Sequence, residues 1–487
     1  METNEGLERV LMQLAESQVK EFLGKLTEVQ EGDLKSLEDL VRSSMNAMGC
    51  QMMETALSAK AQPAPPTSRR EGSCGQMMRQ VAIRGKRLQT LMGPVTLWRP
   101  YYHCAGSQAE EEEQRSENEH AAHGEAPEDE LWGVQRHRCS VGVQRAMSRL
   151  CASMTLEEAA ETLQELFPVS MSARQALNLI QPVGEAMKQQ QEEQQHALFK
   201  QASYKHSQPA SESVRKPAQI NRLYVEIDGV LARLRRGSVA MQDKEQKRAG
   251  DVYREVKVGA VFLAEPGRER STLAPGTFVD AAGPKAYVAH RGGVGAFAPL
   301  LYALAQQHGL AQAQELVILG DGARWIWNLV SEHFPTAIQI VDLWHAKQHV
   351  WQVANAVFGP NTPTAAAWAE PQCSLLEEGN IEALVEAIAL LPPLPPPPTS
   401  AHSIPEQALA YFITNAARMR YPVFRAQGMH IGSGIAEAAC KTVVSTRMKR
   451  SGMRWTPAGL DALLALRTAR LNGTFDAFWE PRFHLVA

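Results

Sequence analysis

Three carboxylates in this sequence stand where a metal-dependent enzyme would place them. Asp228 ends the largely apolar stretch 223–227, and Asp321 ends the apolar run 316–319, where two glycines bracket it. Short apolar runs bounded by turn residues predict buried strands. Open α/β sheets bind ligands at the carboxyl ends of their strands. Glu437 lies further on, in the first turns of a predicted helix.

Two strand-end aspartates and a helical glutamate offer the oxygen ligands that hard cations prefer. Mg²⁺ is held by carboxylates, water and substrate phosphate. Two such ions roughly 3.5–4 Å apart activate a nucleophile and stabilise the leaving oxygen in phosphoryl transfer. Asp228, Asp321 and Glu437 therefore predict a two-ion Mg²⁺ site, with Mn²⁺ as a substitute.

Asp321 and Glu437 also have purely structural interpretations, and Asp228 has a competitor for its position. Asp321 could cap the helix predicted to begin at Ala323. Glu437 could pair with Lys441 one helical turn later. Glu226 competes with Asp228 for the first position, because residues two apart on a strand share one face.

A second group of polar residues follows the next predicted strand. Asp342 and His345 form an Asp-x-x-His step, and His349 lies one turn beyond. The two histidines have the i, i+4 spacing of a zinc site, but the residues between them lack the glutamate that a metalloprotease uses as general base. We therefore assign Asp342 and His345 a supporting or structural role.

Two sets of residues are of the types that bind DNA. The segment 155–178 predicts two short helices joined by a tight break, which resembles a helix-turn-helix. Its second helix would present Arg174, Gln175 and Asn178. A basic stripe suited to phosphate follows Glu437. It consists of Arg447, Lys449, Arg450 and Arg454. The alternatives are an ordinary helical hairpin and a solvated helix face.

Seven regions of the chain must position these residues. Residues 1–62 predict helices that serve packing or self-association, and 63–104 predict a small β region in which basic and aromatic residues alternate. The remaining regions are an acidic disordered linker (105–135), a helical region (136–217, with 188–217 as a polar boundary), the first part of an α/β domain (218–358), a helical insertion with a proline-rich run (359–430), and C-terminal helices (431–487).

Composition excludes several classes of protein. The chain has 487 residues, 44% of them hydrophobic, so it can bury a sizeable core, and its formal net charge is only −3. Any nucleic-acid surface must therefore be local. The acidic N-terminus does not resemble a signal peptide, and no apolar run reaches the ~18 residues of a membrane helix. We expect a soluble, cytoplasmic protein with no membrane partner.

The cysteines do not form a recognisable metal motif. There are seven, without a Cys-x-x-Cys pair, and Cys74 and Cys104 flank the predicted β region singly. A zinc ribbon needs two closely spaced pairs. The spacing therefore argues against zinc.

Four long motifs resemble a known family. They are the stretches 319–329 around Asp321, 333–349 around Asp342 and His345, 418–425, and 432–443 around Glu437. Together they resemble the ISKra-type bacterial insertion-sequence transposases of the Mutator-like DDE group. The resemblance covers most of residues 218–480 and extends more weakly to 74–190. In place of the paired cysteines of the family's ribbon, the segment 87–104 has Cys104 alone.

The resemblance implies an α/β ribonuclease-H-like catalytic core with a helical insertion before the third acidic residue, preceded by helical and ribbon-like DNA-binding regions. It implies Asp228, Asp321 and Glu437 as the Mg²⁺-binding triad. The partners would be double-stranded DNA, both transposon ends and target, and further copies of the chain, because two ends must be joined. Nucleoid association is implied only by this family resemblance. The alternatives are a ribonuclease-H-like nuclease without strand transfer and a domesticated, catalytically silent DNA-binding protein.

Overall fold

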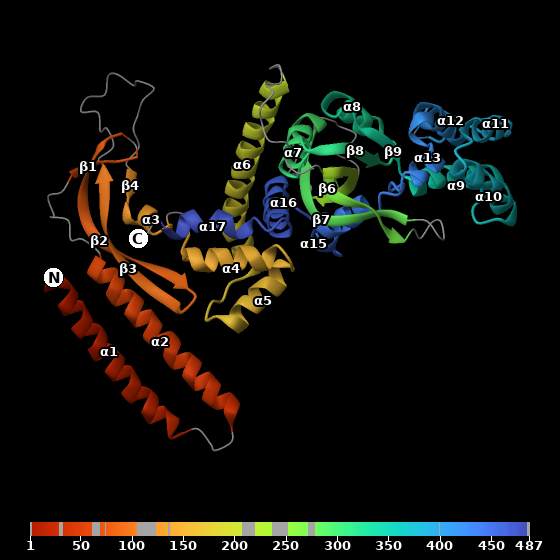
Figure 1. Cartoon of the computed structure of the whole chain (residues 1–487). Coiled ribbons are helices and arrows are strands. Elements are labelled where there is room, and N and C mark those ends of the chain that lie inside the picture. Colours follow the sequence, from red (N-terminus) through yellow and green to blue (C-terminus); the bar gives the residue numbers. More distant parts are fainter. Residues whose placement is uncertain are drawn as a thin grey trace, which may run out of the picture. The chain divides into compact units, whose positions relative to one another are not determined.

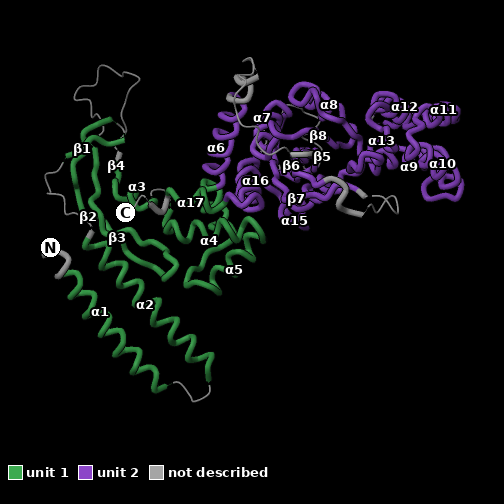
Figure 2. The backbone as a smooth tube through the Cα atoms, in the orientation of Figure 1, with its two compact units in different colours: residues 1–183, 475–487 green, residues 184–474 purple. Residues whose placement is uncertain are grey.

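The chain folds into two compact units, which Figure 2 distinguishes by colour. Unit 1 comprises residues 1–183 and 475–487, and unit 2 comprises residues 184–474. The structure is a computed structural model that describes residues 2–28, 33–60, 69–73, 75–104, 123–134, 137–206, 220–235, 252–270, 278–398 and 400–484. Most of the acidic linker predicted at 105–135 lies outside the described residues, as does the segment 207–219.

Unit 1 begins with a helical hairpin that rests on a small sheet (Figure 1). The hairpin consists of α1 (Glu2–Leu26) and α2 (Leu34–Lys60). The sheet is antiparallel, in the order β1 (Arg69–Glu71), β2 (Met77–Thr90), β3 (Gly93–Cys104), β4 (His123–Glu125). Leu88, Val95 and Leu97 form its buried centre, against which Met53 and Leu57 of α2 pack. This confirms the predicted order of helices followed by a β region.

Further helices complete unit 1. They are α3 (Glu128–Leu131), α4 (Val141–Cys151), α5 (Leu156–Leu166), the start of α6 (Ala173–His206) and α17 (Phe475–His484). Thr155 and Glu158 form the predicted capping box at the start of α5. The boundary predicted at 188–217 is wrong as far as His206, because α6 continues through it. Gln, Glu, Lys and Ala are strong helix formers, so this polar stretch forms a helix.

Unit 2 is built on a five-stranded sheet in the order β7-β6-β5-β8-β9. The strands are β5 (Ile220–Leu234), β6 (Val252–Arg270), β7 (Phe278–Arg291), β8 (Ala313–Gly320) and β9 (Ile338–Val341). The first three pair antiparallel, and β8 and β9 continue parallel to β5. The strands predicted before Asp228, Asp321 and Asp342 are thus three neighbours in one sheet. The predicted strand end at Asp228 is wrong, because β5 continues, paired with β6, to Leu234.

Helices alternate with these strands and then form a separate group. The helices of unit 2 beyond α6 are α7 (Val294–Gln307), α8 (Arg324–His333), α9 (Leu343–Phe358), α10 (Pro363–Glu377), α11 (Ile381–Ala389), α12 (Ile404–Asn415), the 3₁₀ turn Ala416–Arg418, α13 (Tyr421–Ala426), α14 (Gly434–Ala439), the π-helical turn Cys440–Ser445, α15 (Thr446–Met448) and α16 (Pro457–Leu471). The helices α10 to α13 correspond to the predicted insertion. They share one hydrophobic core with the sheet.

A buried polar cluster fastens the end of this insertion to the sheet. Asp280 of β7 accepts hydrogen bonds from Arg222 (2.5 Å) and from the Tyr224 hydroxyl (2.6 Å). The His430 ring contacts the Asp280 carbonyl at 2.6 Å, and the His430 amide donates to Tyr224 Oη at 3.2 Å. Buried charges are tolerated when they are paired in this way. The chain therefore leaves the insertion at a fixed point, a few residues before α14.

The described helices include none that is both long and apolar enough to cross a membrane.

Candidate active site

Three aspartates form a row where the parallel pairing of β5, β8 and β9 ends. Asp321 and Asp342 directly follow β8 and β9, whereas Asp228 lies within β5. The register pairs Glu226 of β5 with Leu319 of β8, so two residues further on both strands Asp228 stands opposite Asp321. It also pairs Gly320 of β8 with Val341 of β9, so the next residues, Asp321 and Asp342, are neighbours. The Asp342 amide donates to the Gly320 carbonyl at 2.8 Å, which extends this ladder to Asp342. The sheet thus brings Asp228, Asp321 and Asp342 together.

Asp342 is the buried anchor of this row. Its Oδ1 caps α9 by accepting from the His345 amide at 2.7 Å, and its Oδ2 accepts from the amide and from the hydroxyl (2.6 Å) of Ser433. Although burial alone would raise the pKa of Asp342, hydrogen bonds from His345 and Ser433 hold it below its usual value. An ionised carboxylate therefore joins β9, α9 and the start of α14.

His345 lies above the row, on the first turn of α9. Its Nδ1 is 3.4 Å from Asp342 Oδ1. The neighbouring Asp342 carboxylate raises the pKa of His345 above its usual value, and the nearby Asp321 and Asp228 add to this effect against the influence of burial. The imidazole is thus within electrostatic reach of all three aspartates. The supporting or structural role of Asp342 and His345 at this site stays a prediction.

Asp228 is the member of the row whose charge is least favoured. Burial raises its pKa and the Asp321 carboxylate raises it further, while hydrogen bonds from the Gly229 amide and the Cys440 thiol partly oppose this. The Gly229 amide lies 2.6 Å from Asp228 Oδ1. A bound cation beside Asp228 and Asp321 would relieve their mutual repulsion.

Asp321 is held by its backbone and by a close aromatic neighbour. Its Oδ1 accepts from the Ala323 amide at 2.8 Å, so Asp321 stabilises the turn before α8, but α8 begins at Arg324 and has no side-chain cap, so the predicted helix-capping role is wrong. The Tyr411 hydroxyl donates to the Asp321 carbonyl at 3.0 Å. Gly322 has φ +95°, and a Cβ there would lie 2.4 Å from the Tyr411 ring. Glycine is therefore required after Asp321, and α12 of the insertion fixes this turn.

Glu437 lies beside the row but is not gathered into it. It is exposed on α14, and no ion pair with Lys441 is found in the described part of the chain. Burial raises the pKa of the Cys440 thiol, and both Asp228 and Glu437 add to the increase. Both carboxylates therefore lie near this thiol. No three described His, Cys, Asp or Glu side chains are arranged to hold a metal ion. The oxygen donors suit Mg²⁺, whereas their present arrangement does not enclose it.

Glu226 also lies near the row of aspartates. The sequence indicated it only as an alternative to Asp228 for the first position of the triad. Glu226 is fully buried, and its Oε2 accepts from the Ala436 amide at 2.7 Å. Burial raises its pKa to about 8, and the nearby Asp342 contributes. Glu226 thus fastens the first turn of α14 from below, as Asp342 does through Ser433. Cys440 and Tyr411, by contrast, carried no sequence signal for a place at the site.

Most of the candidate DNA-contacting residues are exposed, but one of them is buried. Exposed ones are Arg174, Gln175 and Asn178 near the start of α6, and Lys449, Arg450 and Arg454 after α15. Arg447 is different, because it is completely buried and its guanidinium lies 5.3 Å from the centre of the Trp455 ring. Its assignment to a DNA-facing stripe is therefore wrong in this structure. Tertiary packing turns Arg447 inward.

The β region of unit 1 combines paired and exposed basic residues. Arg99 and Lys86 contact Asp129 at 2.7 and 2.9 Å and are largely buried. Arg84 is exposed and lies 3.9 Å from the centre of the Tyr101 ring. Cys104 is buried, and Cys74 lies outside the described residues.

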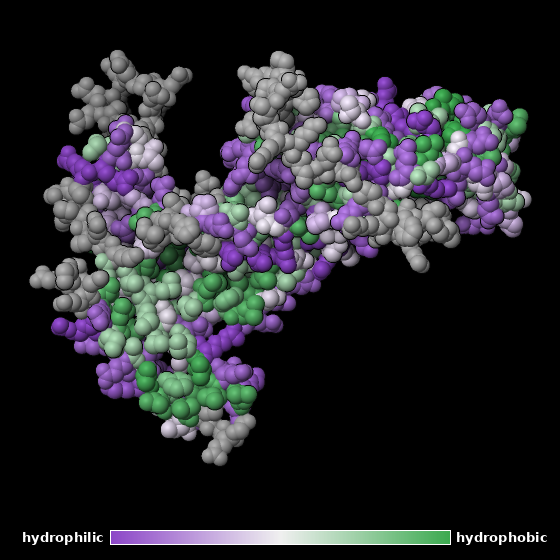
Figure 3. Space-filling view, viewed as in Figure 1, coloured by the Kyte–Doolittle hydropathy of each residue, from purple (hydrophilic) through white to green (hydrophobic). Residues whose placement is uncertain are grey.

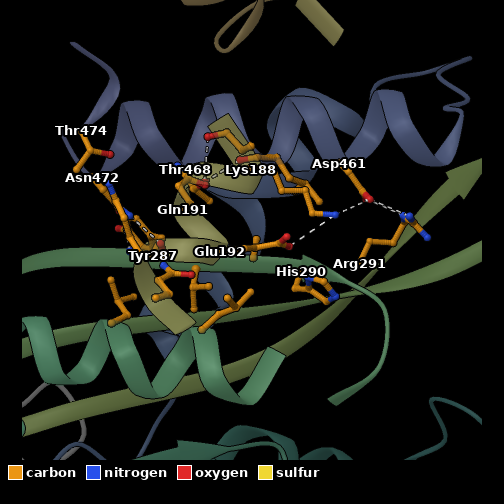
Figure 4. Close-up of a pocket in the computed structure, with 18 of the residues that line it drawn as sticks. Lys188, Gln191, Glu192, Tyr287, His290, Arg291, Asp461, Thr468, Asn472 and Thr474 are labelled. Atoms are coloured by element: carbon orange, nitrogen blue, oxygen red, sulfur yellow. Dashed lines mark hydrogen bonds and ion pairs between the residues drawn. The ribbon is translucent and has the colours of Figure 1, made fainter. Parts of the chain in front are cut away.

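A separate cavity of about 130 Å³ lies in unit 2 between α6, β7, α7 and α16 (Figure 4). Asp461 bridges Arg291 (2.7 Å) and Lys188 (3.1 Å) at its wall, as the dashed lines show. None of the candidate catalytic residues lines this cavity. Its paired charges serve to join α6 and α16 to the sheet.

Comparisons with known proteins give little guidance. No family model matches this chain, and no curated protein matches it. Among solved structures, it is similar to the Drosophila P element transposase strand transfer complex, with 10% sequence identity and a TM-score of 0.22 over 73% of this chain and 84% of that chain. A TM-score this low does not establish a shared fold.

Proposed function

We propose that this chain is a DDE transposase of the ISKra type, which cleaves DNA at transposon ends and joins the freed ends to target DNA. The observation that carries the proposal is the parallel register of β5 and β8, whose continuation by two residues brings Asp228 beside Asp321. Motifs that resemble the family surround Asp321, Asp342 and Glu437. Three antiparallel strands followed by two parallel ones, in the order β7-β6-β5-β8-β9, support a ribonuclease-H-like core.

Asp228, Asp321 and Glu437 are the residues proposed to hold Mg²⁺ or Mn²⁺. Bound there, the ions would supply charge neutralisation and activation of water at a phosphodiester. Asp342 and Glu226 hold α14 against the sheet, and His345 keeps Asp342 oriented. Because α14 is fixed at its first turn, Glu437 stays near the Cys440 thiol, which Asp228 also approaches.

The proposed partner is double-stranded DNA. Lys449, Arg450 and Arg454 are exposed shortly after α14, in the same unit as the aspartate row. Cationic side chains at such a place would hold phosphates near the carboxylates. Arg174, Gln175 and Asn178 are exposed on one helix, as sequence-reading contacts require. A transposase must also bring two ends together, so we propose a homo-oligomer.

The test uses linear duplexes that carry the DNA flanking the gene, incubated with the full chain and Mg²⁺. We expect cleavage at one position near each flank and, with a supercoiled target plasmid, covalent joining of the cut ends. Asp321→Ala is expected to abolish both reactions and to retain DNA binding. Unchanged cleavage by that variant would refute the site.

Other outcomes identify the alternatives. Cleavage that is never followed by joining would indicate a nuclease without strand transfer. Specific binding of the flanks without cleavage, in either Mg²⁺ or Mn²⁺, would indicate a silent DNA-binding protein. Glu437→Gln distinguishes a site of three carboxylates from a site that needs only Asp228 and Asp321. A site that needs only the two aspartates would leave residual cleavage in this variant, whereas the triad would not.

A further inference from the structure

The α1–α2 hairpin exposes apolar side chains at regular spacing. On α1, Met12, Val19 and Leu26 are seven residues apart and exposed, with Leu23 between the last two. On α2, Leu34 and Val41 are exposed at the same spacing, followed by Met45. Figure 3 shows apolar side chains gathered over this hairpin. Isolated exposed apolar residues are ordinary, whereas two parallel stripes mark an interaction surface.

The two stripes meet in one apolar groove. A cavity of about 220 Å³ lies between the helices, lined by Val19, Phe22, Val41, Met45 and Met48 together with the small or uncharged Gln18 and Ser44. Three exposed ion pairs of the hairpin each join residues of one helix at i, i+4 spacing. These pairs are Lys20–Glu16, Lys25–Glu21 and Lys35–Asp39. The groove therefore has no charged wall that would oppose an apolar occupant.

The spacing indicates that the occupant is helical. A repeat of seven residues keeps an apolar seam facing another helix along its whole length. Both helices carry such a seam, so a pair of helices fits better than one. Beneath α2, Cys50, Met53 and Leu57 pack on the sheet, and Arg42 donates to the Glu165 carbonyl of α5 at 2.5 Å. Among the described elements, α1 packs extensively only on α2, and α2 only on α1 and β3.

We propose that two copies of this chain associate through their α1–α2 hairpins and form a four-helix bundle. A pair of helices of 25 and 27 residues offers a strip about 40 Å long and about 20 Å wide. That is roughly 800 Å² per copy, which is what a stable protein interface needs. The surface is self-complementary, because an identical hairpin brings the same seams and flanks of mixed charge, as a two-fold interface requires.

This assembly is independent of the catalytic proposal, because it forms without DNA or metal. Sedimentation velocity of the full chain over a range of concentrations tests it. Wild-type protein is expected to sediment at twice its 53.7 kDa mass. Val19→Glu and Met45→Glu, made separately, are each expected to raise the dimer dissociation constant at least tenfold, because each places a charge in the seam.

Matched controls locate the effect. Leu390→Glu and Ile413→Glu place the same charge on exposed apolar positions of unit 2, with 86% and 62% of the side chain exposed, and are expected to leave the mass unchanged. Should a glutamate variant fail to fold by circular dichroism, Val19→Ser and Met45→Gln weaken the seam with less disturbance. Wild-type protein that remains monomeric at tens of micromolar would overturn the proposal. So would folded hairpin variants that dimerise like wild type.

Discussion

Asp228 and Asp321 stand side by side on adjacent parallel strands, 93 residues apart in sequence, as the register that pairs Glu226 with Leu319 continues to them. The Asp321 carboxylate raises the pKa of Asp228 beyond the increase that burial causes. Two carboxylates held this close repel each other unless a cation or a proton lies between them. The pair therefore behaves as one unit.

Such a unit predicts non-additive effects of substitution. We expect Asp228→Asn and Asp321→Asn each to reduce Mg²⁺-dependent cleavage by at least a thousandfold, and the double variant to be no worse than either single one. Single-turnover cleavage assays measure this. Both variants should gain or keep thermal stability in the absence of metal, because each removes the repulsion. Multiplicative losses would mean that the two aspartates act separately.

Asp342 is expected to matter for stability more than for chemistry. Asp342→Ala removes a buried acceptor and leaves the His345 and Ser433 donors unpaired, which should cost about 3 kcal/mol of unfolding free energy. Ser433→Ala removes one of these bonds and should cost about 1 kcal/mol. Urea unfolding compares the two. Equal costs would show that Asp342 does not anchor α14.

Glu226 makes the stability of unit 2 depend on pH. Its pKa is about 8 in the folded chain against an ordinary value of 4.5, because burial disfavours the charged form. The folded state thus binds more protons than the unfolded state between these values, so stability falls as the pH rises from about 4.5 to about 8. In Glu226→Gln this contribution is absent.

Thermal unfolding at pH 5 and pH 8.5 measures that difference. The melting temperature of Glu226→Gln relative to wild type should rise by several degrees between the two pH values. The quantity to compare is the change in melting temperature with pH, not the melting temperature at one pH, because burial of the introduced amide lowers stability equally at both pH values. A parallel pH dependence in both proteins would mean that Glu226 is already paired with a compensating charge.

The sequence predicted the strands better than the site. Apolar runs before Asp228, Asp321 and Asp342 indicated buried strands, and all three strands are present. Periodicity cannot reveal that these strands are neighbours in register, because register depends on hydrogen bonds between segments about 90 residues apart. Nor can it place Glu437, whose helix is held by Asp342 and Glu226. Residue type also gave a wrong prediction for Arg447. An arginine in a basic stripe is expected at the surface, and only the packing against Trp455 reveals that this one is buried.

Substitution of Arg447 should therefore reduce stability, whereas substitution of its exposed basic neighbours should reduce DNA affinity. Lys449, Arg450 and Arg454 are exposed, and each is expected to contact one phosphate. Alanine at any of these positions should weaken binding of all duplexes alike and reduce the slope of log K against log salt by about 1. Arg447→Met should leave that slope unchanged. Fluorescence anisotropy at several salt concentrations gives the slopes.

The same four variants should show the opposite order in stability. Arg447 is buried against the Trp455 ring, and Trp455 is itself fixed by donating its indole N–H to the Met448 carbonyl at 2.9 Å. Arg447→Met removes the cation–π contact with the Trp455 ring and changes the packing of a fully buried side chain, so the melting temperature should fall by roughly 5 °C. Surface alanines should change it by about 1 °C or less. An Arg447 variant that lost DNA affinity while keeping wild-type stability would show that this side chain turns outward when DNA is bound.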